Sequence, residues 1–346
     1  MFLTEKEILD TPNALAKTVA YFAEKKADID GFFAAHKERK FTVFGCGSSY
    51  MLAKGFAALL CGCPNTAACA IAAGDYIVAP EAWQEALRGS IIISLSRSGR
   101  TSEVVRAIAD AKAKFGCPVV SLSMEDGNDI MPMSDLDIVM DWCYDRSVCQ
   151  TRTVTNLYAA SLLLTAAYAG DEALAGAVKA ACHGNEAFQT GSRAKLEEIA
   201  KLDWNNVVVL ADGPVCGIAE EGALAVTEIA MLTGRYFHLL DYRHGPIVVS
   251  DKHTLTLILL RSGEEKYQYA MVKDVMAHGG PVVTVSDAAG NPCGAAAHLQ
   301  IRDVANFAAW GIPFIYVAQM VSLLKAVEMG GNPDAPTGLD AYITLG

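Results

Sequence analysis

The sequence lacks the features that mark several classes of protein. Its apolar runs are all shorter than the roughly 18 to 20 residues that a helix needs to cross a bilayer, and the charged stretch Met1–Glu7 has no signal-type apolar segment. The ten cysteines form no C-x-x-C pair, and Cys61 and Cys63 have no neighbours at zinc-ligand spacing. We therefore expect a cytoplasmic protein with reduced thiols, without a metal site and without a membrane partner.

Basic residues are in the minority. The chain has 28 Lys and Arg against 39 Asp and Glu, which gives a formal net charge of −11. A nucleic-acid surface is normally basic, so this balance argues against a nucleic-acid partner. An anionic small ligand is still compatible with it, because local amides and helix dipoles decide such binding rather than the global charge.

Apolar residues are abundant and follow alternating strand and helix patterns. They make up 52% of 346 residues, and charged residues only 19%, so the chain can bury the core of two domains or of one large one. In the first half, strands are expected at residues 41–44, 91–95 and 118–123. Strands that alternate with helices predict an α/β fold with a parallel sheet covered on both faces.

The second half repeats this order, with strands expected at residues 207–210, 255–260 and 281–286. Matching landmarks are separated by nearly equal intervals, which are 166 residues for Gly47 and Gly213, 164 for Ser98 and Ser262, and 163 for Pro118 and Pro281. We therefore predict a duplicated unit. The expected fold is two tandem flavodoxin-like, three-layer α/β/α domains, each with a parallel sheet of about five strands.

Helical segments flank and join the two units. The pattern Thr4–Glu7 predicts a capping box, and helices are expected to about His36, packed outside the first sheet. Residues 157–181 and 195–202 are also expected to be helical, which puts the boundary between the units near 184–191. The predicted layout is N-terminal helices at 1–36, a first domain at 37–183, a second domain at 192–330 and a tail at 331–346.

The turn Ser96–Glu103 is the most informative stretch. It follows the expected strand 91–95 and leads directly into a helical pattern, so backbone N–H groups and the helix dipole favour an anion there. The hydroxyls of Ser96, Ser98 and Thr101 can donate further hydrogen bonds. Helix capping alone would need one hydroxyl, so we predict a phosphate site. In the second copy, the carboxylates of Glu264 and Glu265 would repel a phosphate.

A dinucleotide-binding loop is the alternative interpretation of Gly45 and Gly47. The third glycine of G-x-G-x-x-G is missing because position 50 is tyrosine, and no acidic residue closes a strand about 20 residues further on. We therefore expect no nucleotide cofactor.

Several motifs together resemble the sugar isomerase (SIS) domain family. They are Gly45–Ser49, Ser96–Thr101, Glu221–Leu224, Arg243–Pro246 and Gly331–Pro336. As a tandem pair of such domains, nearly the whole chain is similar to the isomerase half of glucosamine-6-phosphate synthase, to amino-sugar-phosphate deaminases and to tagatose-6-phosphate ketose/aldose isomerases. The resemblance implies a phosphosugar-binding first domain and a tail that closes over the active site.

The resemblance also implies roles for individual residues. Glu228 would move the proton, and His244 would handle ring opening. His244 would come from the other chain of a homodimer with shared active sites, and such dimers could pair further. The residues that would bind the phosphate or the rest of the substrate are Ser48, Ser49, Ser96, Arg97, Ser98, Thr101, Gln150 and Arg152.

Elementary chemistry is compatible with the two catalytic assignments. Glu228 lies seven residues after Glu221, so both can share one face of a helix, and partial burial would raise a carboxyl pKa towards neutrality. His244 precedes Gly-Pro in an expected loop, where an imidazole can titrate near neutrality. Without the motifs, a solvated glutamate and a structural histidine would be the simpler interpretations. His238 and His253 are the next candidates.

Two departures from the synthase pattern narrow the expected activity. Ala225 stands where the synthase has a lysine, and the stretch Pro336–Ala341 lacks the lysine that forms an imine with the sugar. We also expect no glutamine-hydrolysing domain. These features favour an isomerase or deaminase of a hexose or hexosamine 6-phosphate that uses aldose–ketose proton transfer and no cofactor. A fructosamine-6-phosphate deglycase and a non-catalytic sugar-phosphate sensor are the alternatives.

Overall fold

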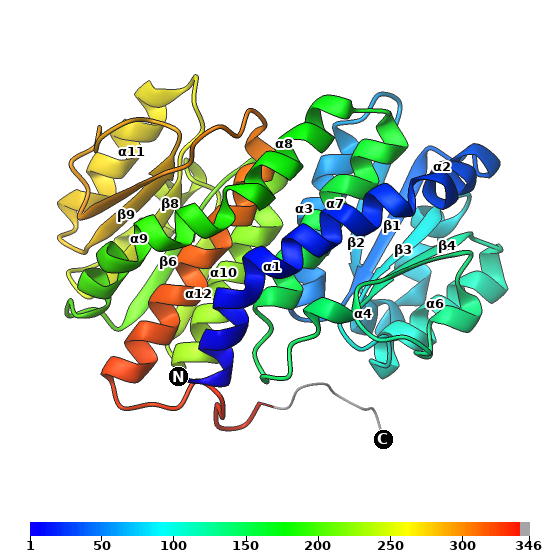
Figure 1. Cartoon of the computed structure of the whole chain (residues 1–346), viewed down its shortest axis with the longest axis horizontal. Coiled ribbons are helices and arrows are strands. Elements are labelled where there is room, and N and C mark those ends of the chain that lie inside the picture. Colours follow the sequence, from blue (N-terminus) through cyan, green and yellow to red (C-terminus); the bar gives the residue numbers. More distant parts are fainter. Residues whose placement is uncertain (340–346) are drawn as a thin grey trace.

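The computed structural model describes residues 1–339 and contains two five-stranded parallel sheets (Figure 1). The first sheet has the order β2-β1-β3-β4-β5. Its strands are β1 (Lys40–Gly45), β2 (Ala67–Ala72), β3 (Ile91–Leu95), β4 (Val119–Ser123) and β5 (Leu136–Val139).

The second sheet has the order β10-β9-β8-β6-β7. Its strands are β6 (Asn206–Leu210), β7 (Thr233–Phe237), β8 (Thr254–Leu259), β9 (Val282–Ser286) and β10 (Ala297–Gln300). Counted from its own first strand, each half has the order 2-1-3-4-5, which is the flavodoxin-like order. The prediction of two parallel sheets in three-layer α/β/α arrangements is confirmed.

The six strands predicted from the sequence are the inner strands of the two sheets. β2, β5, β7 and β10 were not placed, and each of them is an edge strand. Inner strands such as β3 and β8 are buried at every residue, whereas β2 and β7 are mostly half-buried or exposed. A strand covered on both faces has a continuous apolar signal, and an edge strand has a weaker one.

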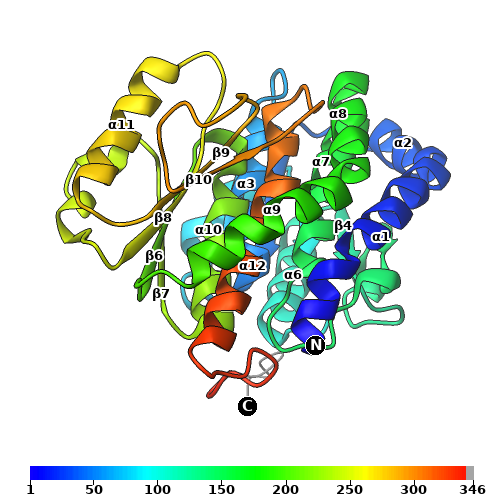
Figure 2. The same ribbon diagram turned by 60° about the vertical axis from the view of Figure 1, so that its left-hand side comes forward.

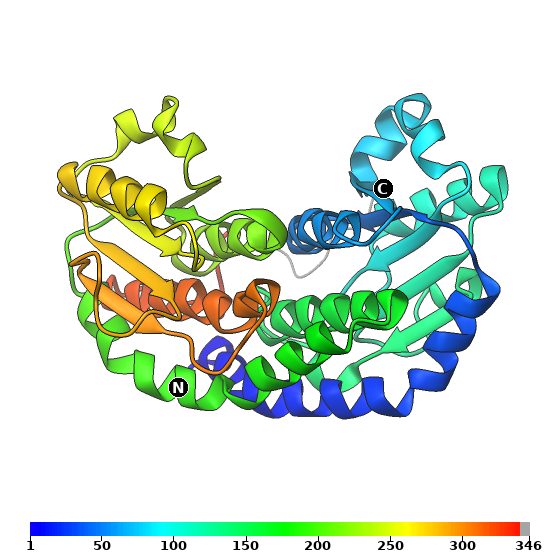
Figure 3. The ribbon, with the colours of Figure 1, turned by 90° about the horizontal axis from the view of Figure 1, so that it is seen from above.

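The two sheets share a central layer of helices (Figure 3). α3 (Ser48–Cys61) and α7 (Arg152–Ala169) from the first half lie there with α10 (Cys216–Ala230) and α12 (Gly311–Glu328) from the second. Apolar side chains of both halves form one continuous cluster in this layer. The outer faces are covered by α4 (Ala73–Val78), α5 (Gln84–Leu87) and α6 (Ser102–Phe115) on the first sheet and by α11 (Glu265–Ala277) on the second.

α12 belongs to a helical stretch, Phe307–Glu328, that is long and apolar enough to cross a membrane. Within the protein, 89% of its most apolar window is buried. α12 packs mainly against α10 and α9 (Asn185–Ala200). Its apolar character therefore corresponds to a position in the core of the fold.

The predicted N-terminal helices are present as α1 (Leu3–Glu24) and α2 (Lys26–Ala35). We expected the N-terminal helices to pack outside the first sheet, but α1 also contacts the second half. It packs on α7 and α8 (Glu172–His183) and also reaches α9 and α12 of the second half (Figure 2). The Glu5 carboxylate pairs with Arg193 of α9 at 3.0 Å. α1 therefore connects the two halves.

One local expectation is wrong. Thr4 and Glu7 do not form a capping box, because the N-terminal amides of α1 donate to the Asp334 carboxylate and Glu7 turns to another partner.

The predicted boundary near 184–191 coincides with the start of α9, which begins at Asn185 and contains residue 192. Where one unit ends and the next begins remains a prediction.

Candidate active site

The hydroxyl-rich turn lines a cavity of about 150 Å³ beyond the carboxyl ends of β1 and β3. This is the switch point of the first sheet, since β2 lies on one side of β1 and β3 on the other, and ligands of such sheets bind there. Of the described residues, those lining the cavity are Cys46, Gly47, Ser48, Ser49, Leu95, Ser96, Arg97, Ser98, Thr101, Glu103, Val104, Val148, Gln150, Glu228 and Leu339.

The turn after β3 is held in one shape by its own hydrogen bonds. Ser96 Oγ accepts from the Gly99 amide at 2.9 Å, and Ser98 Oγ accepts from the Arg100 amide at 3.2 Å. Because these serine oxygens act as acceptors, their O–H groups are still available to donate to an anion. Gly99 has φ +63°, and a Cβ there would lie 2.3 Å from the side chain of Asn128. The turn therefore requires glycine.

The start of α3 forms the second wall of the cavity. Ser48 and Ser49 open this helix, and both are buried. A Cβ on Gly45 would lie 2.5 Å from the backbone carbon of Ser49, so glycine allows the first turn of α3 to fold directly over the end of β1. The N-terminus of a helix and two hydroxyls thus border the same space as the turn after β3.

Arg97 brings a positive charge to the cavity wall and also holds a neighbouring loop. Its guanidinium donates to the carbonyl oxygens of Ser147 at 2.9 Å and Asp145 at 3.3 Å, and it lies over the ring of Tyr144. The side chain is only 5% exposed. Residues 144–151, hereafter the 144–151 loop, contribute Val148 and Gln150 to the cavity.

Glu228 is the residue that the second half adds to this cavity. Burial raises the pKa of its carboxyl to about 7, although the positive charge of Arg97 opposes the rise. A carboxyl with a pKa near the working pH can both accept and return a proton, as a general base and acid must. The structure therefore places the predicted base beside the predicted phosphate turn.

Glu221 lies two turns earlier on α10 and was not proposed as a site residue. Its side chain is fully buried, and neither carboxylate oxygen has a hydrogen-bond partner within residues 1–339. Burial, followed by the charge of Glu228, holds the pKa of Glu221 well above its usual range. The signal that could have identified it was the seven-residue interval to Glu228, which puts both glutamates on one face of the helix, together with the glycine and alanine that follow Glu221.

Close contact between α3 and α10 brings the two glutamates to the first half. A Cβ on Gly217 would lie 2.3 Å from the Met51 carbonyl oxygen, and one on Gly55 would lie 3.0 Å from that of Pro214. Lys54 of α3 also contacts both carboxylate oxygens of Glu220 at 2.7 Å. These two glycines let the backbones approach far more closely than helices with side chains at the crossing would allow.

Glu103 is another cavity residue that the sequence reasoning missed. It lies in the first turn of α6, and one of its carboxylate oxygens is buried without a hydrogen-bond partner in the described part of the chain. Burial raises the pKa of the Cys46 thiol to about 11, and the charge of Glu103 contributes to this rise. The available signal was its place directly after the hydroxyl-rich turn. An acidic residue in the first turn of a helix usually has a simpler explanation, which is its favourable interaction with the helix dipole.

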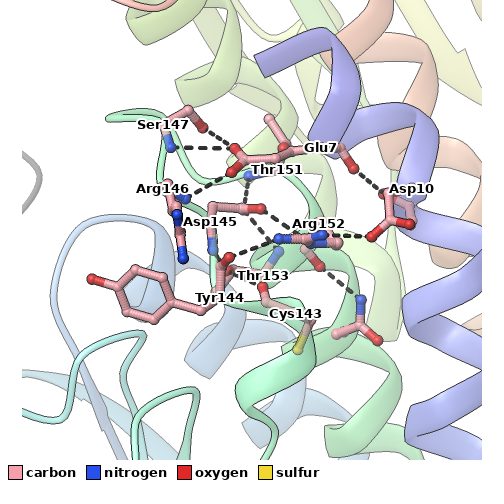
Figure 4. A network of polar contacts seen from close by, with 12 residues as sticks. Glu7, Asp10, Cys143, Tyr144, Asp145, Arg146, Ser147, Thr151, Arg152 and Thr153 are labelled. Carbon is pink, nitrogen blue, oxygen red and sulfur yellow. Dashed lines mark hydrogen bonds and ion pairs between the residues drawn. The ribbon is translucent and has the colours of Figure 1, made fainter. Parts of the chain in front are cut away.

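Arg152 does not line the cavity, contrary to the prediction. Its guanidinium pairs with Asp10 of α1, lies 3.5 Å from the Asp145 carboxylate and donates to the Tyr144 carbonyl at 2.7 Å (Figure 4). Two buried or half-buried carboxylates attract the arginine away from the cavity. Gln150, two residues earlier, does line the cavity, and its role towards the substrate remains a prediction.

His244 does not line the cavity either, among the residues that the structure describes. It is exposed after a short 3-10 helix, and its neighbour Arg243 pairs with Asp274 at 2.7 Å. His238, a second candidate, lies 3.1 Å from Asp212 on the surface. One chain therefore does not bring His244 to Glu228, and the expected contribution across a dimer remains a prediction.

The tail reaches the cavity through Leu339. Asp340 and Ala341, on which the expectation of no imine-forming lysine depends, lie outside the described residues. A larger cavity, about 1060 Å³, lies elsewhere, beside α8, α9 and β10, and its described lining contains none of the predicted site residues. Within residues 1–339, no group of three or more His, Cys, Asp or Glu side chains could hold a metal ion.

The fold and the site agree with a known class of domain. Residues 202–329 match the family model described as the SIS domain. The matched segment includes Glu228 and the second sheet, whereas the hydroxyl-rich turn lies before it.

Comparison with whole proteins extends the similarity to the first half. A glutamine–fructose-6-phosphate aminotransferase of Pseudomonas putida is 25% identical over 98% of this chain, which spans 58% of that relative's length. The D-galactosamine-6-phosphate deaminase AgaS of Shewanella sp. is 27% identical over 77% of this chain and 69% of its own. The structure of tagatose-6-phosphate ketose/aldose isomerase from Escherichia coli has the same fold, with a TM-score of 0.86 at 20% identity, over 99% of this chain and 96% of that one.

Proposed function

We propose that this chain is a phosphosugar isomerase or deaminase that acts on a hexose or hexosamine 6-phosphate by aldose–ketose proton transfer. One observation carries the proposal. A carboxyl with a pKa near 7, Glu228, lines the same small cavity as the hydroxyl-rich turn that precedes α6. A phosphate held at the turn would fix the rest of the sugar beside the base.

The residues divide into two roles. The phosphate would be bound by the hydroxyls and helix N-termini around Ser48, Ser49, Ser96, Ser98 and Thr101. Glu228 would then take the proton from the carbon next to the carbonyl of the open sugar. The resulting enediol or enolamine would receive that proton back on the adjacent carbon. For a 2-amino sugar, this transfer gives a ketimine, which water hydrolyses to the ketose and ammonia.

The names of the relatives support the substrate class. The three proteins compared above are named for fructose 6-phosphate, galactosamine 6-phosphate and tagatose 6-phosphate. All three are phosphorylated sugars whose reactions pass through an open-chain carbonyl. This chain matches 58% of the length of the aminotransferase, so the aminotransferase's complete reaction is not part of the proposal.

The proposal includes a second SIS domain in the first half and a homodimer. The shared strand order and the similarity over nearly the whole chain support two such domains. The absence of His244 from the cavity within residues 1–339 of one chain supports a shared site, in which a second copy supplies this imidazole. A cytoplasmic location, as expected for an enzyme of intermediary sugar metabolism, belongs to the same proposal.

The test is a panel of phosphosugars assayed for ketose formation and for ammonia. Wild-type protein should convert at least one of glucosamine, galactosamine, tagatose and fructosamine 6-phosphates. Glu228→Gln should reduce turnover by about a thousandfold or more, because a general base typically contributes 10²–10⁴-fold. It should leave the calorimetric Kd for that sugar phosphate within a few-fold of wild type.

A matched control is Glu198→Gln, which removes an exposed carboxylate on α9 that pairs with Lys201. Its turnover should equal that of wild type. Equal loss of turnover and binding in Glu228→Gln would contradict the role of Glu228. Phosphosugar binding with no product from any member of the panel would identify a non-catalytic sensor instead, and release of an amine from fructosamine 6-phosphate alone would identify a deglycase.

A further inference from the structure

The 144–151 loop contains no regular helix or strand, yet it forms part of the cavity wall. A segment of this kind needs other groups to fix its backbone. Figure 4 shows that two buried carboxylates do so, one from the loop itself and one from α1. The second of these, Glu7, is more than 130 residues away in the sequence.

Glu7 is bound directly to the loop backbone. Its carboxylate accepts from the Arg146 amide at 2.7 Å and the Ser147 amide at 3.3 Å, and it also contacts the Ser147 hydroxyl (Figure 4). The side chain is 4% exposed. Hydrogen bonds from three donors offset the cost of burying the carboxylate at this position.

Asp145 closes the loop from the inside. Its carboxylate accepts from the Thr151 amide at 2.6 Å and the Thr153 amide at 2.8 Å, so the beginning of the loop is bonded to the first turn of α7. Arg152 lies between this carboxylate and Asp10 of α1. The arginine that was predicted to bind substrate therefore balances the negative charge of the loop's supports.

Ser147 joins α1 to the cavity. Its amide faces Glu7, while its carbonyl oxygen accepts from the Arg97 guanidinium at 2.9 Å. Movement of Ser147 away from Glu7 would therefore displace a carbonyl partner of Arg97. The adjacent positions Val148 and Gln150, which line the cavity, would move with it.

The tail fixes α1 at the same end. Asp334 accepts from the amides of Leu3 at 2.7 Å and Thr4 at 2.8 Å and from the Thr4 hydroxyl at 2.7 Å. The two amides belong to the first turn of α1, where backbone N–H groups have no partner within the helix, and Glu7 follows one turn later. The tail, α1 and the loop thus form one connected set of contacts around the cavity.

We propose that Glu7 is a positioning residue of the phosphosugar site, because it fixes Ser147 and so sets the positions of Arg97 and Gln150. The inference rests on the proposed function for the identity of the ligand. α1 would then support the binding site from outside, since within the described residues α1 itself does not line the cavity. Its effect is expected on substrate binding rather than on the proton-transfer step.

The experiment compares Glu7→Gln with Glu24→Gln, a control that changes an exposed glutamate at the other end of the same helix. Glutamine keeps the size of Glu7 but turns an amide group towards donors that need an acceptor. Glu7→Gln should raise KM for the phosphosugar, and Kd for glucose 6-phosphate and for inorganic phosphate, by about tenfold or more. Its kcat should stay within about threefold of wild type.

Hydrogen–deuterium exchange supplies a readout that does not depend on turnover. The peptide containing the Arg146 and Ser147 amides should exchange faster in Glu7→Gln, whereas peptides from the second sheet should not change. Glu24→Gln should match wild type in every measurement. If Glu7→Gln does not fold, Ser147→Ala, which removes one donor only, should raise both Kd values several-fold.

Three results would overturn the inference. The first is unchanged exchange of the 144–151 loop in Glu7→Gln, and the second is faster exchange with unchanged KM and Kd. The third is a kcat loss equal to or larger than the KM change, which would contradict a positioning role. If wild-type protein turns over no phosphosugar but binds one, the proposed enzymatic function fails while exchange and Kd still decide the role of Glu7.

Discussion

Glu221 and Glu228 occupy the same helix but differ in their surroundings. Glu228 lines the cavity, and Glu221 is enclosed without a hydrogen-bond partner in the described part of the chain. Both pKa values are raised, chiefly by burial. Ala225, one turn after Glu221 on the same helix, is buried and has no charge with which to balance either carboxylate. The charge of Glu228 is the second cause of the raised pKa of Glu221. With a pKa of about 7, the Glu228 carboxyl keeps its proton part of the time near neutrality.

This proton has a measurable effect on stability. The pKa of Glu228 rises from 4.5 in an unfolded chain to about 7 in the folded protein, so the folded state binds the proton more tightly. Its contribution to stability is complete below about pH 4.5 and is lost as the pH rises to about 7. One pKa unit corresponds to about 1.4 kcal/mol, so the rise from 4.5 to about 7 limits the loss to about 3.5 kcal/mol.

Glu228→Gln should remove this dependence. In urea unfolding between pH 5 and 8, the difference in unfolding free energy between the variant and wild type should move in favour of the variant as the pH rises. Groups such as Asp145, whose pKa burial raises to about 7, titrate in both proteins and cancel in the difference. A difference that does not change with pH would show that the Glu228 pKa is not raised.

At the scale of elements, the crossing of α3 and α10 is the feature on which the site depends. α3 begins with Ser48 and Ser49, and α10 carries Glu228, so the distance between base and phosphate site follows from how closely these helices approach. The approach is set by Gly55 and Gly217. Neither glycine touches the cavity within the described residues.

Gly217→Ala should therefore affect both stability and turnover. Its Cβ would meet the Met51 carbonyl oxygen at 2.3 Å, and backbone atoms cannot yield as a flexible side chain can. Overpacking of this kind typically costs about 1–3 kcal/mol, and the displaced Glu228 should lower kcat. The measurements are thermal unfolding and steady-state kinetics of the proposed reaction.

Gly176→Ala is the control, because it also replaces a helical glycine, on α8, but the new methyl group has no atom within 4 Å. It should stabilise the protein slightly, since alanine favours helix by up to about 1 kcal/mol over glycine. If Gly217→Ala behaved like Gly176→Ala, the close contact between α3 and α10 would not be the determinant proposed here.

At the scale of the whole molecule, the two sheets are not independent bodies. Their shared helical layer forms one apolar cluster (Figure 3), and α1 contacts helices of both halves. Separation of the halves would expose this cluster to water, at a cost proportional to the apolar area. The halves should therefore fold and unfold together.

Scanning calorimetry of the full chain should show a single unfolding transition, with the calorimetric enthalpy of unfolding equal to the van't Hoff enthalpy. Urea unfolding followed by circular dichroism and by tryptophan fluorescence should give coincident curves, because Trp142 lies in the first half and Trp204 in the second. Two resolved transitions would mean that each half is stable alone.

Sequence patterns predicted the molecule best where the determinants are local. The inner strands β1, β3, β4, β6, β8 and β9 are continuous apolar runs, and each was placed to within about a residue at either end. The hydroxyl-rich turn was identified because its strand, glycine and hydroxyls are consecutive. The edge strands escaped notice because partial exposure weakens their apolar pattern.

Long-range contacts decide where the sequence was least informative. The family resemblance implied a substrate role for Arg152, but in the structure Asp10, from a helix 142 residues earlier, and Asp145 attract its charge. Thr4 was assigned to a capping box, but Asp334 caps that helix from the other end of the chain. Neither partner can be recognised from neighbouring residues.

The amino-acid sequence by itself determined the alternation of strands and helices in each half and the hydroxyl-rich turn between a strand and a helix, because each follows from the spacing of neighbouring residues. Only the tertiary structure decided that Glu228 lines the same cavity as this turn, that Glu221 is buried without a hydrogen-bond partner within residues 1–339, and that Glu7 is bonded to the 144–151 loop. The physical reason is that burial and close helix packing depend on contacts between distant segments, and burial sets both the charge state and the position of a carboxyl group.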